Sequence, residues 1–323
     1  MVKVDVGRTL FVLYADDLSI KLRLCKNQIL DERVMNLQLS KVIDWMNANL
    51  LSFNRDKTEM VLVTRGSREP YRGLKLTVGD QVIRPKRACR MLGMQFTANM
   101  REDWYINQMK GNLISFLNQR IYFLSKLRPK VGDKQFRALT YGLLFSKIYF
   151  CVQKYGNCTE ILKDKIRITC NRAVRMCSNI TLADRRRTRD TYYENKFLTF
   201  DGILRSQDVS LLWSVMYSYT PTYLATKVWG MRSLEEERRR QEGPRTRARV
   251  SNMRPRFTRD NTGTYHQRRS NWMGRAMRFN EYLITKQPEF YRKFTQFWSM
   301  TTRKKMLKEL LLELEHDQVD IPL

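Results

Sequence analysis

Two adjacent aspartates follow a short apolar run near the N-terminus, within the four residues Tyr14–Asp17. The run itself, residues 9–14, is continuously apolar, which is typical of a strand buried on both faces. Residues 18–22 then alternate between apolar and polar side chains, which predicts a half-buried strand. We therefore expect a hairpin that carries the two carboxylates at its tip.

Two carboxylates on a rigid turn suit divalent-cation chemistry. Enzymes that join nucleotides hold two cations about 4 Å apart, and magnesium accepts one or two protein carboxylates while keeping several waters. Adjacent carboxylates repel each other unless a cation neutralises them. The alternative is an ordinary acidic turn, because aspartate is a favoured turn residue. The two strands around the turn favour the metal-binding interpretation.

The elements that must position this hairpin follow it in the chain. An amphipathic helix is predicted from about Asn27, a suitable N-cap, to residue 49. Strands are expected at residues 59–64, at 74–78 and 81–84 around a Gly79-Asp80 turn, and at 89–97.

From residue 101 the apolar period becomes helical. Pro129 ends a first stripe, and further helices are expected at residues 133–150, 160–178 and through much of 179–230. Residues 232–270 are arginine-rich and aperiodic, which indicates a basic arm. A last helix is expected near the C-terminus. The stripe consists of Trp104, Met109, Leu113, Leu117, Leu124 and Leu127.

The net charge of +28 and the pI near 10.1 predict a polyanionic partner, above all nucleic acid. A basic coat that merely keeps the protein soluble is the alternative. The net charge is uneven along the chain: it is +7 over residues 1–97, +10 over 98–178, +11 over 179–278 and zero over 279–323.

Six cysteines are too few for a disulfide scaffold, and no pair has the C-x-x-C spacing of a zinc site. We expect small core residues in a reduced protein, and no zinc. The sequence contains neither a signal peptide nor a membrane-spanning run. It therefore predicts an intracellular protein of the nucleus or cytoplasm, with no membrane partner. Nothing in it indicates the oligomeric state.

The order of these elements resembles the C-terminal half of a reverse transcriptase palm followed by its thumb, and is most similar to non-LTR (LINE-type) retrotransposons. Residues 14–17 match the Y-A-D-D motif, and residues 47–58 resemble the N.L.LN..KTE stretch that follows it. Leu92-Gly93 matches the LG of the primer-grip strand. Residues 192–223 and 260–272 resemble the C-terminal region of such elements.

The resemblance implies an α+β protein of three parts. Residues 1–97 would be the C-terminal part of a ferredoxin-like (RRM-like) palm with a partial antiparallel sheet. Residues 98–178 would be a helical thumb. Residues 179–323 would be a mostly helical C-terminal region with the basic arm at about 232–270. Its partners would be an RNA template, a DNA primer and dNTP, and its cofactor Mg²⁺ or Mn²⁺.

Residue by residue, the resemblance implies that Asp16 ligates the metal and that Asp17 is its weaker neighbour. Lys57 would stabilise the incoming triphosphate, unless it is a solvated loop lysine. Tyr14 and Ala15 would lie along the minor groove at the primer. Three residues would hold the primer terminus, although a glycine at a strand bulge would explain the middle one equally well. These three are Leu92, Gly93 and Met94.

One departure limits the catalytic expectation. The family places another metal-binding aspartate upstream of the hairpin, and here thirteen residues precede Tyr14. Asp5 is too close to the hairpin to substitute. We therefore expect a fragment that polymerises nothing by itself, with Met1 an internal methionine or a product of gene prediction. Two alternatives remain: a non-catalytic nucleic-acid-binding protein, and a fragment of a group II intron or retron reverse transcriptase.

Two arginine clusters predict non-specific RNA and DNA binding that weakens steeply with salt. The alternative for the second cluster is local neutralisation by Glu235–Glu237 and Glu242. On the opposite face of the stripe near residues 104–127, Lys110, Arg120 and Lys126 could follow phosphates. The clusters consist of Arg185, Arg186, Arg187 and Arg189, and of Arg238, Arg239, Arg240, Arg245, Arg247 and Arg249.

Overall fold

The computed structural model confirms an α+β protein, with about 66% of the described residues in helices. The chain divides into two compact units, Met1–Met109 and Lys110–Leu323, which we describe separately. Among the described residues, no helix is long and apolar enough to cross a membrane. The described residues are 9–14, 17–25, 27–54, 56–63, 71, 73–78, 81–99, 104–108, 112–180, 186–218, 221–222, 224, 272–296 and 299–321.

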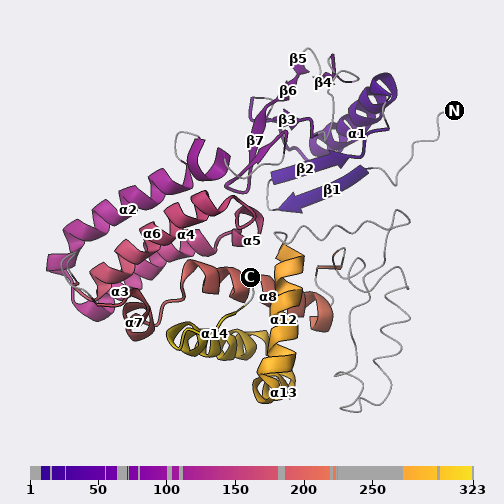
Figure 1. The fold of residues 1–323 in the computed structure, drawn as a ribbon. Coiled ribbons are helices and arrows are strands. Elements are labelled where there is room, and N and C mark those ends of the chain that lie inside the picture. The colour runs from indigo at the N-terminus through magenta and orange to yellow at the C-terminus, as the bar shows by residue number, and fades with distance from the viewer. Residues whose placement is uncertain are drawn as a thin grey trace. The chain divides into compact units, whose positions relative to one another are not determined.

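The described strands of the N-terminal unit form four separate two-stranded sheets (Figure 1). The pairs β1–β2, β4–β5 and β7–β8 are antiparallel, whereas β3 and β6 are parallel. This differs from the single partial antiparallel palm sheet that the sequence predicted. The strands are β1 (Thr9–Tyr14), β2 (Asp17–Leu22), β3 (Met60–Val61), β4 (Leu76–Val78), β5 (Gln81–Ile83), β6 (Pro85–Lys86), β7 (Ala88–Met91) and β8 (Met94–Thr97).

The segment expected as one strand at residues 89–97 is a hairpin. Leu92 and Gly93 have φ angles of 48° and 76°, and Met91 pairs with Met94 across them. Two consecutive left-handed residues match the twist of the flanking strands and turn the chain within two residues. The hairpin predicted from residues 74–78 and 81–84 is confirmed, because Val78 pairs with Gln81 on either side of Gly79 and Asp80 in the sequence.

Helix α1 (Gln28–Ala48) forms the main support of this unit. The Asn27 side chain caps it by accepting a hydrogen bond from the Leu30 amide at 3.1 Å, as the sequence predicted. Leu39 of α1 packs with Leu76 of β4 and Ile83 of β5, and Ile20 of β2 lies against the same cluster. The hairpin β1–β2 is therefore attached to α1 through β2.

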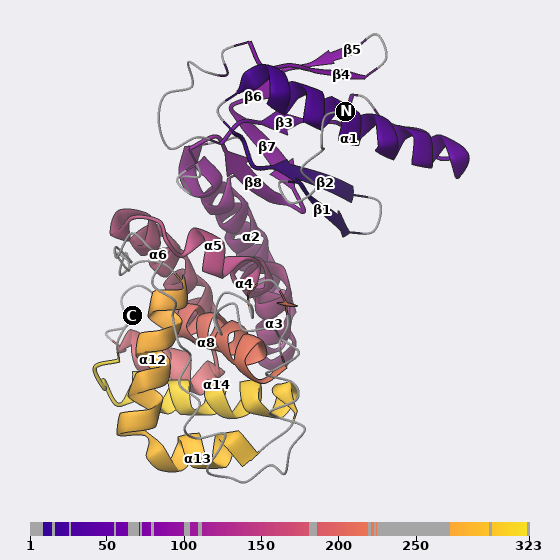
Figure 2. The same ribbon diagram turned by 90° about the vertical axis from the view of Figure 1, so that its right-hand side faces the viewer.

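The C-terminal unit is helical, and its central helix α8 contacts α5, α6, α12 and α14 (Figures 1 and 2). Between α2 and α8 its helices are α2 (Leu113–Leu127), a 3₁₀ turn (Arg128–Lys130), α3 (Asp133–Thr140), a π-helical turn (Tyr141–Phe145), α4 (Ser146–Tyr149), α5 (Val152–Tyr155), α6 (Glu160–Cys177), α7 (Thr188–Asn195) and α8 (Phe200–Ser218). The last three are α12 (Trp272–Lys286), α13 (Pro288–Gln296) and α14 (Met300–His316).

The apolar stripe expected before Pro129 is confirmed in α2, where Leu113, Leu117 and Leu124 are buried. The helix expected at 133–150 is present but interrupted by the π-helical turn, and it ends before Cys151, which has a left-handed φ of 55°. Of the six cysteines expected in the core, Cys158, Cys170 and Cys177 are buried. Cys25 is exposed, because it lies in the short connection between β2 and α1.

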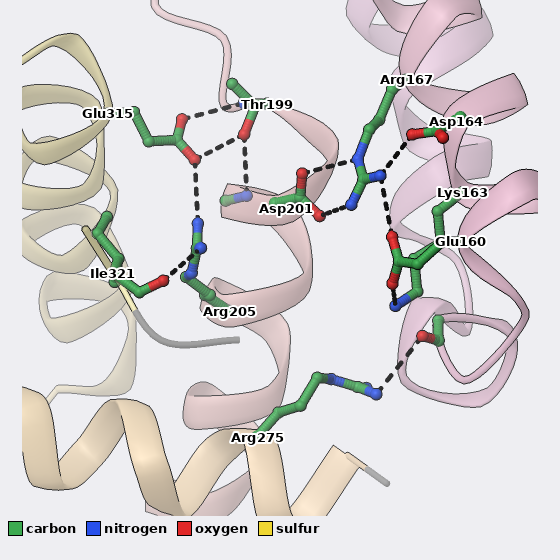
Figure 3. A network of polar contacts seen from close by, with 12 residues as sticks. Glu160, Lys163, Asp164, Arg167, Thr199, Asp201, Arg205, Arg275, Glu315 and Ile321 are labelled. Atoms are coloured by element: carbon green, nitrogen blue, oxygen red, sulfur yellow. Dashed lines mark hydrogen bonds and ion pairs between the residues drawn. The ribbon is translucent and has the colours of Figure 1, made fainter. Parts of the chain in front are cut away.

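Partly buried charges join the helices of the C-terminal unit (Figure 3). Arg167 of α6 donates two hydrogen bonds to Asp201 of α8, at 2.8 and 2.7 Å. Glu315 of α14 accepts hydrogen bonds from the Thr199 hydroxyl (2.6 Å) and amide (3.2 Å) at the start of α8. These contacts fix α6, α8 and α14 to one another.

A more deeply buried ion pair, between Arg275 of α12 and Asp208 of α8, joins these two helices. The Arg275 Nε donates to Asp208 Oδ2 at 2.6 Å, and Arg275 Nη1 donates to Asn157 Oδ1 at 2.7 Å. The side chains of Arg275 and Asp208 are 4% and 0% exposed, respectively. Burial raises the pKa of Asp208 to about 6, and the hydrogen bond and charge of Arg275 oppose that rise.

Candidate catalytic hairpin and nucleic-acid interface

The β1–β2 hairpin predicted around the two aspartates is present. Tyr14 pairs with Asp17 across the ladder, and two residues, Ala15 and Asp16, separate them in the sequence. The Asp17 side chain is exposed. Ala15, Asp16 and the Tyr14 side chain lie outside the described part of the structure, so their predicted roles stay predictions.

Strand β1 is not buried on both faces, contrary to the expectation from its apolar run. Leu10, Phe11, Val12 and Leu13 have exposed fractions between 44% and 69%. Within the described residues β1 pairs with β2, and pairing along an edge covers neither face of a strand, so the exposure shows that these side chains lack elements packed over them. A continuous apolar run predicts a strand that needs cover on both faces, but it does not supply that cover.

Three contacts connect β2, the residues that follow it and the start of α1 to the rest of the N-terminal unit. The Ser19 hydroxyl of β2 lies 3.1 Å from the Met91 sulfur of β7. Beyond β2, the buried Asp31 carboxylate accepts hydrogen bonds from the Cys25 amide (3.0 Å) and from the Tyr71 hydroxyl (2.9 Å). The end of β2 is thereby tied to the first turn of α1. Sequence analysis did not single out Asp31, because its acceptor role depends on residues up to 40 positions away.

The described residues do not complete a metal site at the hairpin tip. Asp17 is its one described carboxylate, and no group of three or more His, Cys, Asp or Glu side chains that could hold a metal occurs among the described residues. A two-metal site takes carboxylates from more than one rigid element. Asp16, which the resemblance assigns as the metal ligand, lies outside the described residues, so binding of Mg²⁺ or Mn²⁺ at the hairpin stays a prediction and no catalytic step is derived from it.

Lys57 lies in a turn that Asn54 organises. The Asn54 side chain accepts from the Lys57 amide at 3.1 Å, and the Asn54 carbonyl accepts from the Thr58 hydroxyl at 2.9 Å. The Lys57 side chain is exposed, and no contact within the described residues joins it to Asp17. The structure thus leaves its predicted role at the triphosphate as a prediction.

The predicted primer-holding residues form the turn of the β7–β8 hairpin and its first residue beyond. Leu92 is 40% exposed, whereas the Met94 side chain is 3% exposed and belongs to the core. A leucine in the left-handed region is strained by roughly 1–2 kcal/mol. Such strain is more common at functional sites than elsewhere. The strain at Leu92 is consistent with a functional turn in which Leu92 is exposed to solvent and Met94 is buried next to it.

The first arginine cluster is partly engaged with acids of α7. Arg186 forms an ion pair with Glu194, and Arg189 Nε lies 3.6 Å from Asp190 Oδ1. Arg187 is the exposed residue directly before α7. Arg185 and the entire second cluster, Arg238–Arg249, lie outside the described residues. The described arginines therefore do not form a row of unopposed cations.

A more uniformly basic segment of the sequence lies between the β7–β8 hairpin and the first arginine cluster. Residues 104–159 contain nine lysines and arginines and a single acid, Asp133. That acid is in an ion pair with Arg128 at 2.6 Å. Exposed Tyr122 and Phe123 of α2 lie within this segment, and sequence analysis did not select them. The near-absence of acidic residues from 104 to 159 is a sequence signal that could have identified this segment.

Comparison of the chain with known protein families, with characterised proteins and with solved structures found no match.

Proposed function

We propose that the chain is part of an RNA-directed DNA polymerase of the non-LTR retrotransposon type. The observation that carries the proposal is the β1–β2 register, in which Tyr14 pairs with Asp17. This register suits a Tyr-Ala-Asp-Asp sequence placed at the tip of a hairpin. A helix, the β4–β5 hairpin, the segment with Leu92 and Gly93 and a helical unit follow in the order that the family resemblance implies.

The reaction of such an enzyme is attack of a primer 3′-OH on the α-phosphate of a dNTP, with release of pyrophosphate. The described carboxylates do not complete the metal site for it. In addition, β1 presents an apolar surface with one described pairing partner. Because a two-metal site takes carboxylates from more than one rigid element, the two adjacent aspartates of the hairpin do not form one by themselves, and we propose that the isolated 323-residue chain extends no primer.

The test begins with the genomic DNA upstream of Met1. The proposal expects an open frame that encodes an apolar strand followed by an aspartate. The extended protein should then elongate a DNA primer on an RNA template with Mg²⁺, and Asp16→Asn with Asp17→Asn should abolish elongation. An extended protein that is inactive, or is active without these two aspartates, would contradict the proposal. Intron ribozyme sequence around the frame would assign it instead to a group II intron enzyme.

A nucleic-acid-binding protein without catalysis is the second candidate function. Nine basic residues against one acid in residues 104–159 favour it. The discriminating measurement is the affinity of the 323-residue chain for RNA and DNA before and after Asp16→Asn with Asp17→Asn. A binding protein keeps its affinity in this variant, because its contacts are to phosphates and bases rather than through a metal at the hairpin.

A further inference from the structure

We propose that one face of α2, together with the end of α4, binds an unpaired nucleic-acid strand by stacking bases on exposed aromatic rings and holding phosphates with the adjacent cations. The inference rests on the proposed nucleic-acid partner and assigns it a surface. We call this surface the α2–α4 face, and it consists of Arg120, Tyr122, Phe123, Lys126, Lys147 and Phe150.

Helical geometry separates this face from the core. The buried side chains of α2 are Leu113, Leu117, Ile121 and Leu124. Tyr122 and Lys126 are four residues apart and therefore neighbours on the surface. They lie on the side of the helix away from that buried stripe, and Phe123 lies beside them. Tyr122 is 66% exposed and Phe123 is 47% exposed. The packing of α2 against the core therefore leaves both aromatic rings exposed to solvent.

Two rings of the face, Tyr122 and Phe150, are in cation–π contact with lysines of the face. Lys126 Nζ lies 5.4 Å from the centre of the Tyr122 ring. Lys147 Nζ of α4 lies 5.0 Å from the Phe150 ring and 5.8 Å from the ring of Phe116 of α2. Arg120 lies 4.9 Å above the same Phe116 ring. Phe116 thereby links the α2 and α4 parts of the face, because Lys147 of α4 contacts its ring.

The alternation of rings and cations selects the kind of ligand. Unpaired bases expose a π-face that stacks on an aromatic side chain, whereas the bases of a duplex already stack on each other. Lysines and arginines beside the rings suit the phosphates that connect such bases. An acidic protein would be attracted by the cations but would not need the rings. The exposed aromatics therefore favour a single strand over a duplex or an acidic protein.

The backbone near Lys147 shows a second feature that accompanies binding sites. The π-helical turn Tyr141–Phe145 lies directly before α4. Such turns occur frequently at functional sites, because one extra residue rotates the side chains that follow. Here they include Lys147, which reaches the Phe116 ring of α2. The chain then leaves the helix at Phe150, whose ring is 39% exposed.

Fluorescence anisotropy of the full chain with a 20-nucleotide oligouridine RNA and with a 20-base-pair RNA duplex tests the proposal. The ring variant Tyr122→Leu with Phe123→Leu and Phe150→Leu keeps apolar volume and charge. We expect it to bind oligouridine at least tenfold more weakly, since each removed ring takes away a surface on which an unpaired base stacks. The change for the duplex should be below about twofold.

A charge variant separates the second part of the mechanism. Arg120→Gln with Lys126→Gln and Lys147→Gln should reduce the slope of log affinity against log salt by about 2 for oligouridine, at roughly 0.7 per phosphate contact. The matched control removes three cations elsewhere in the same unit, through Lys293→Gln, Lys304→Gln and Lys305→Gln. Its slope should stay that of the unmodified chain. Tyr193→Leu, another exposed ring, is the control for the aromatic variant.

The outcomes distinguish this inference from the proposed function. Failure of the unmodified chain to bind any RNA would overturn both the nucleic-acid partner and this inference. Binding that the ring and charge variants leave unchanged would overturn this inference alone. Equal losses for oligouridine and the duplex would also overturn it, because stacking on unpaired bases predicts a difference. Circular dichroism melting of each variant confirms that the helices are retained.

Discussion

The two units differ in how completely they bury their side chains. In the described part of Met1–Met109, the buried apolar residues other than Ile106 keep between 3% and 8% of their surface exposed. In Lys110–Leu323, large side chains such as Phe136, Tyr155 and Trp213 are 0% exposed. The hairpin with the two aspartates therefore lies in the unit with the thinner core.

Charged contacts with little solvent exposure are also concentrated in the C-terminal unit. The C-terminal unit contains the Arg275–Asp208 pair and the Glu315 and Arg167 contacts, while the N-terminal unit relies on Asp31 and on exposed pairs such as Lys86–Glu59. A buried pair is costly to break, and an exposed pair is cheap. The C-terminal unit is therefore specified by its own interior, whereas the N-terminal unit leaves part of its apolar surface without described cover.

Breaking the buried pair should have the largest effect. Arg275→Met leaves the Asp208 carboxyl without its guanidinium partner in a site that is 0% exposed. We expect a loss of roughly 3–5 kcal/mol in the free energy of unfolding of the C-terminal unit. Hydrogen exchange measured by mass spectrometry should show faster exchange in α8 and α12 and unchanged exchange in α1.

Two further variants sharpen this comparison. Lys86→Met breaks the exposed 2.8 Å pair with Glu59 and should cost less than about 1 kcal/mol. Asp208→Leu combined with Arg275→Met removes both charges and should recover most of the stability that Arg275→Met loses. A cost for Arg275→Met no larger than that of Lys86→Met would show that the buried pair does not hold α12 on α8.

The pH dependence of the C-terminal unit should show the next largest effect. Burial raises the pKa of Asp208 from 3.8 to about 6. Between those two values the folded protein binds a proton that the unfolded chain has released, so the Asp208 contribution to stability falls as the pH rises from about 4 to 6. The corresponding change is on the order of 3 kcal/mol. Burial also raises the pKa of Glu315, which acts in the same direction.

Urea denaturation at several pH values tests this dependence. Asp208→Asn keeps an oxygen that can accept from Arg275 but does not titrate, so its stability should vary less between pH 4 and pH 6. Glu160, whose pKa is lowered chiefly by the hydrogen bond from Lys163, has the opposite slope and supplies the control. Glu160→Gln should remove stability that is gained as the pH rises past its folded pKa. Identical pH profiles for Asp208→Asn and the unmodified chain would contradict the assignment.

Local sequence signals predicted the local structure well. The Asn27 cap, the β1–β2 and β4–β5 hairpins, and the α2 stripe with Leu113, Leu117 and Leu124 all depend on residues close together in the chain. The break at Cys151 was missed, because a left-handed φ at a residue other than glycine or asparagine leaves no compositional signal.

Long-range properties could not be predicted in the same way. The apolar run of β1 indicates a strand whose faces need to be covered, but its exposure depends on which distant elements pack over those faces. Asp208 and Arg275 are 67 residues apart, and nothing local distinguishes this arginine from the many others. For the candidate site, the hairpin was predicted correctly, while Asp16 and the second arginine cluster lie outside the described residues.

The smallest effect on folding is expected at the exposed edge of the N-terminal unit, where the change should appear in association instead. Leu13 is 69% exposed on β1, a strand of apolar residues with one described pairing partner. Such an edge pairs with other chains unless something prevents it. At low salt the net charge of +28 keeps copies apart. Raising the salt from about 0.1 to 1 M shortens the screening length from about 10 to 3 Å, so the unmodified chain should self-associate.

Leu13→Lys should prevent this association while changing the stability of the unit by less than about 0.5 kcal/mol, because the side chain is already solvent-exposed. Ile161→Lys is the matched control, since it adds the same charge at an apolar position on α6 that is 73% exposed. Size-exclusion chromatography with light scattering at both salt concentrations should show a monomer for Leu13→Lys and assemblies for Ile161→Lys. Equal behaviour of the two variants would mean that overall charge, rather than the open edge of β1, governs self-association.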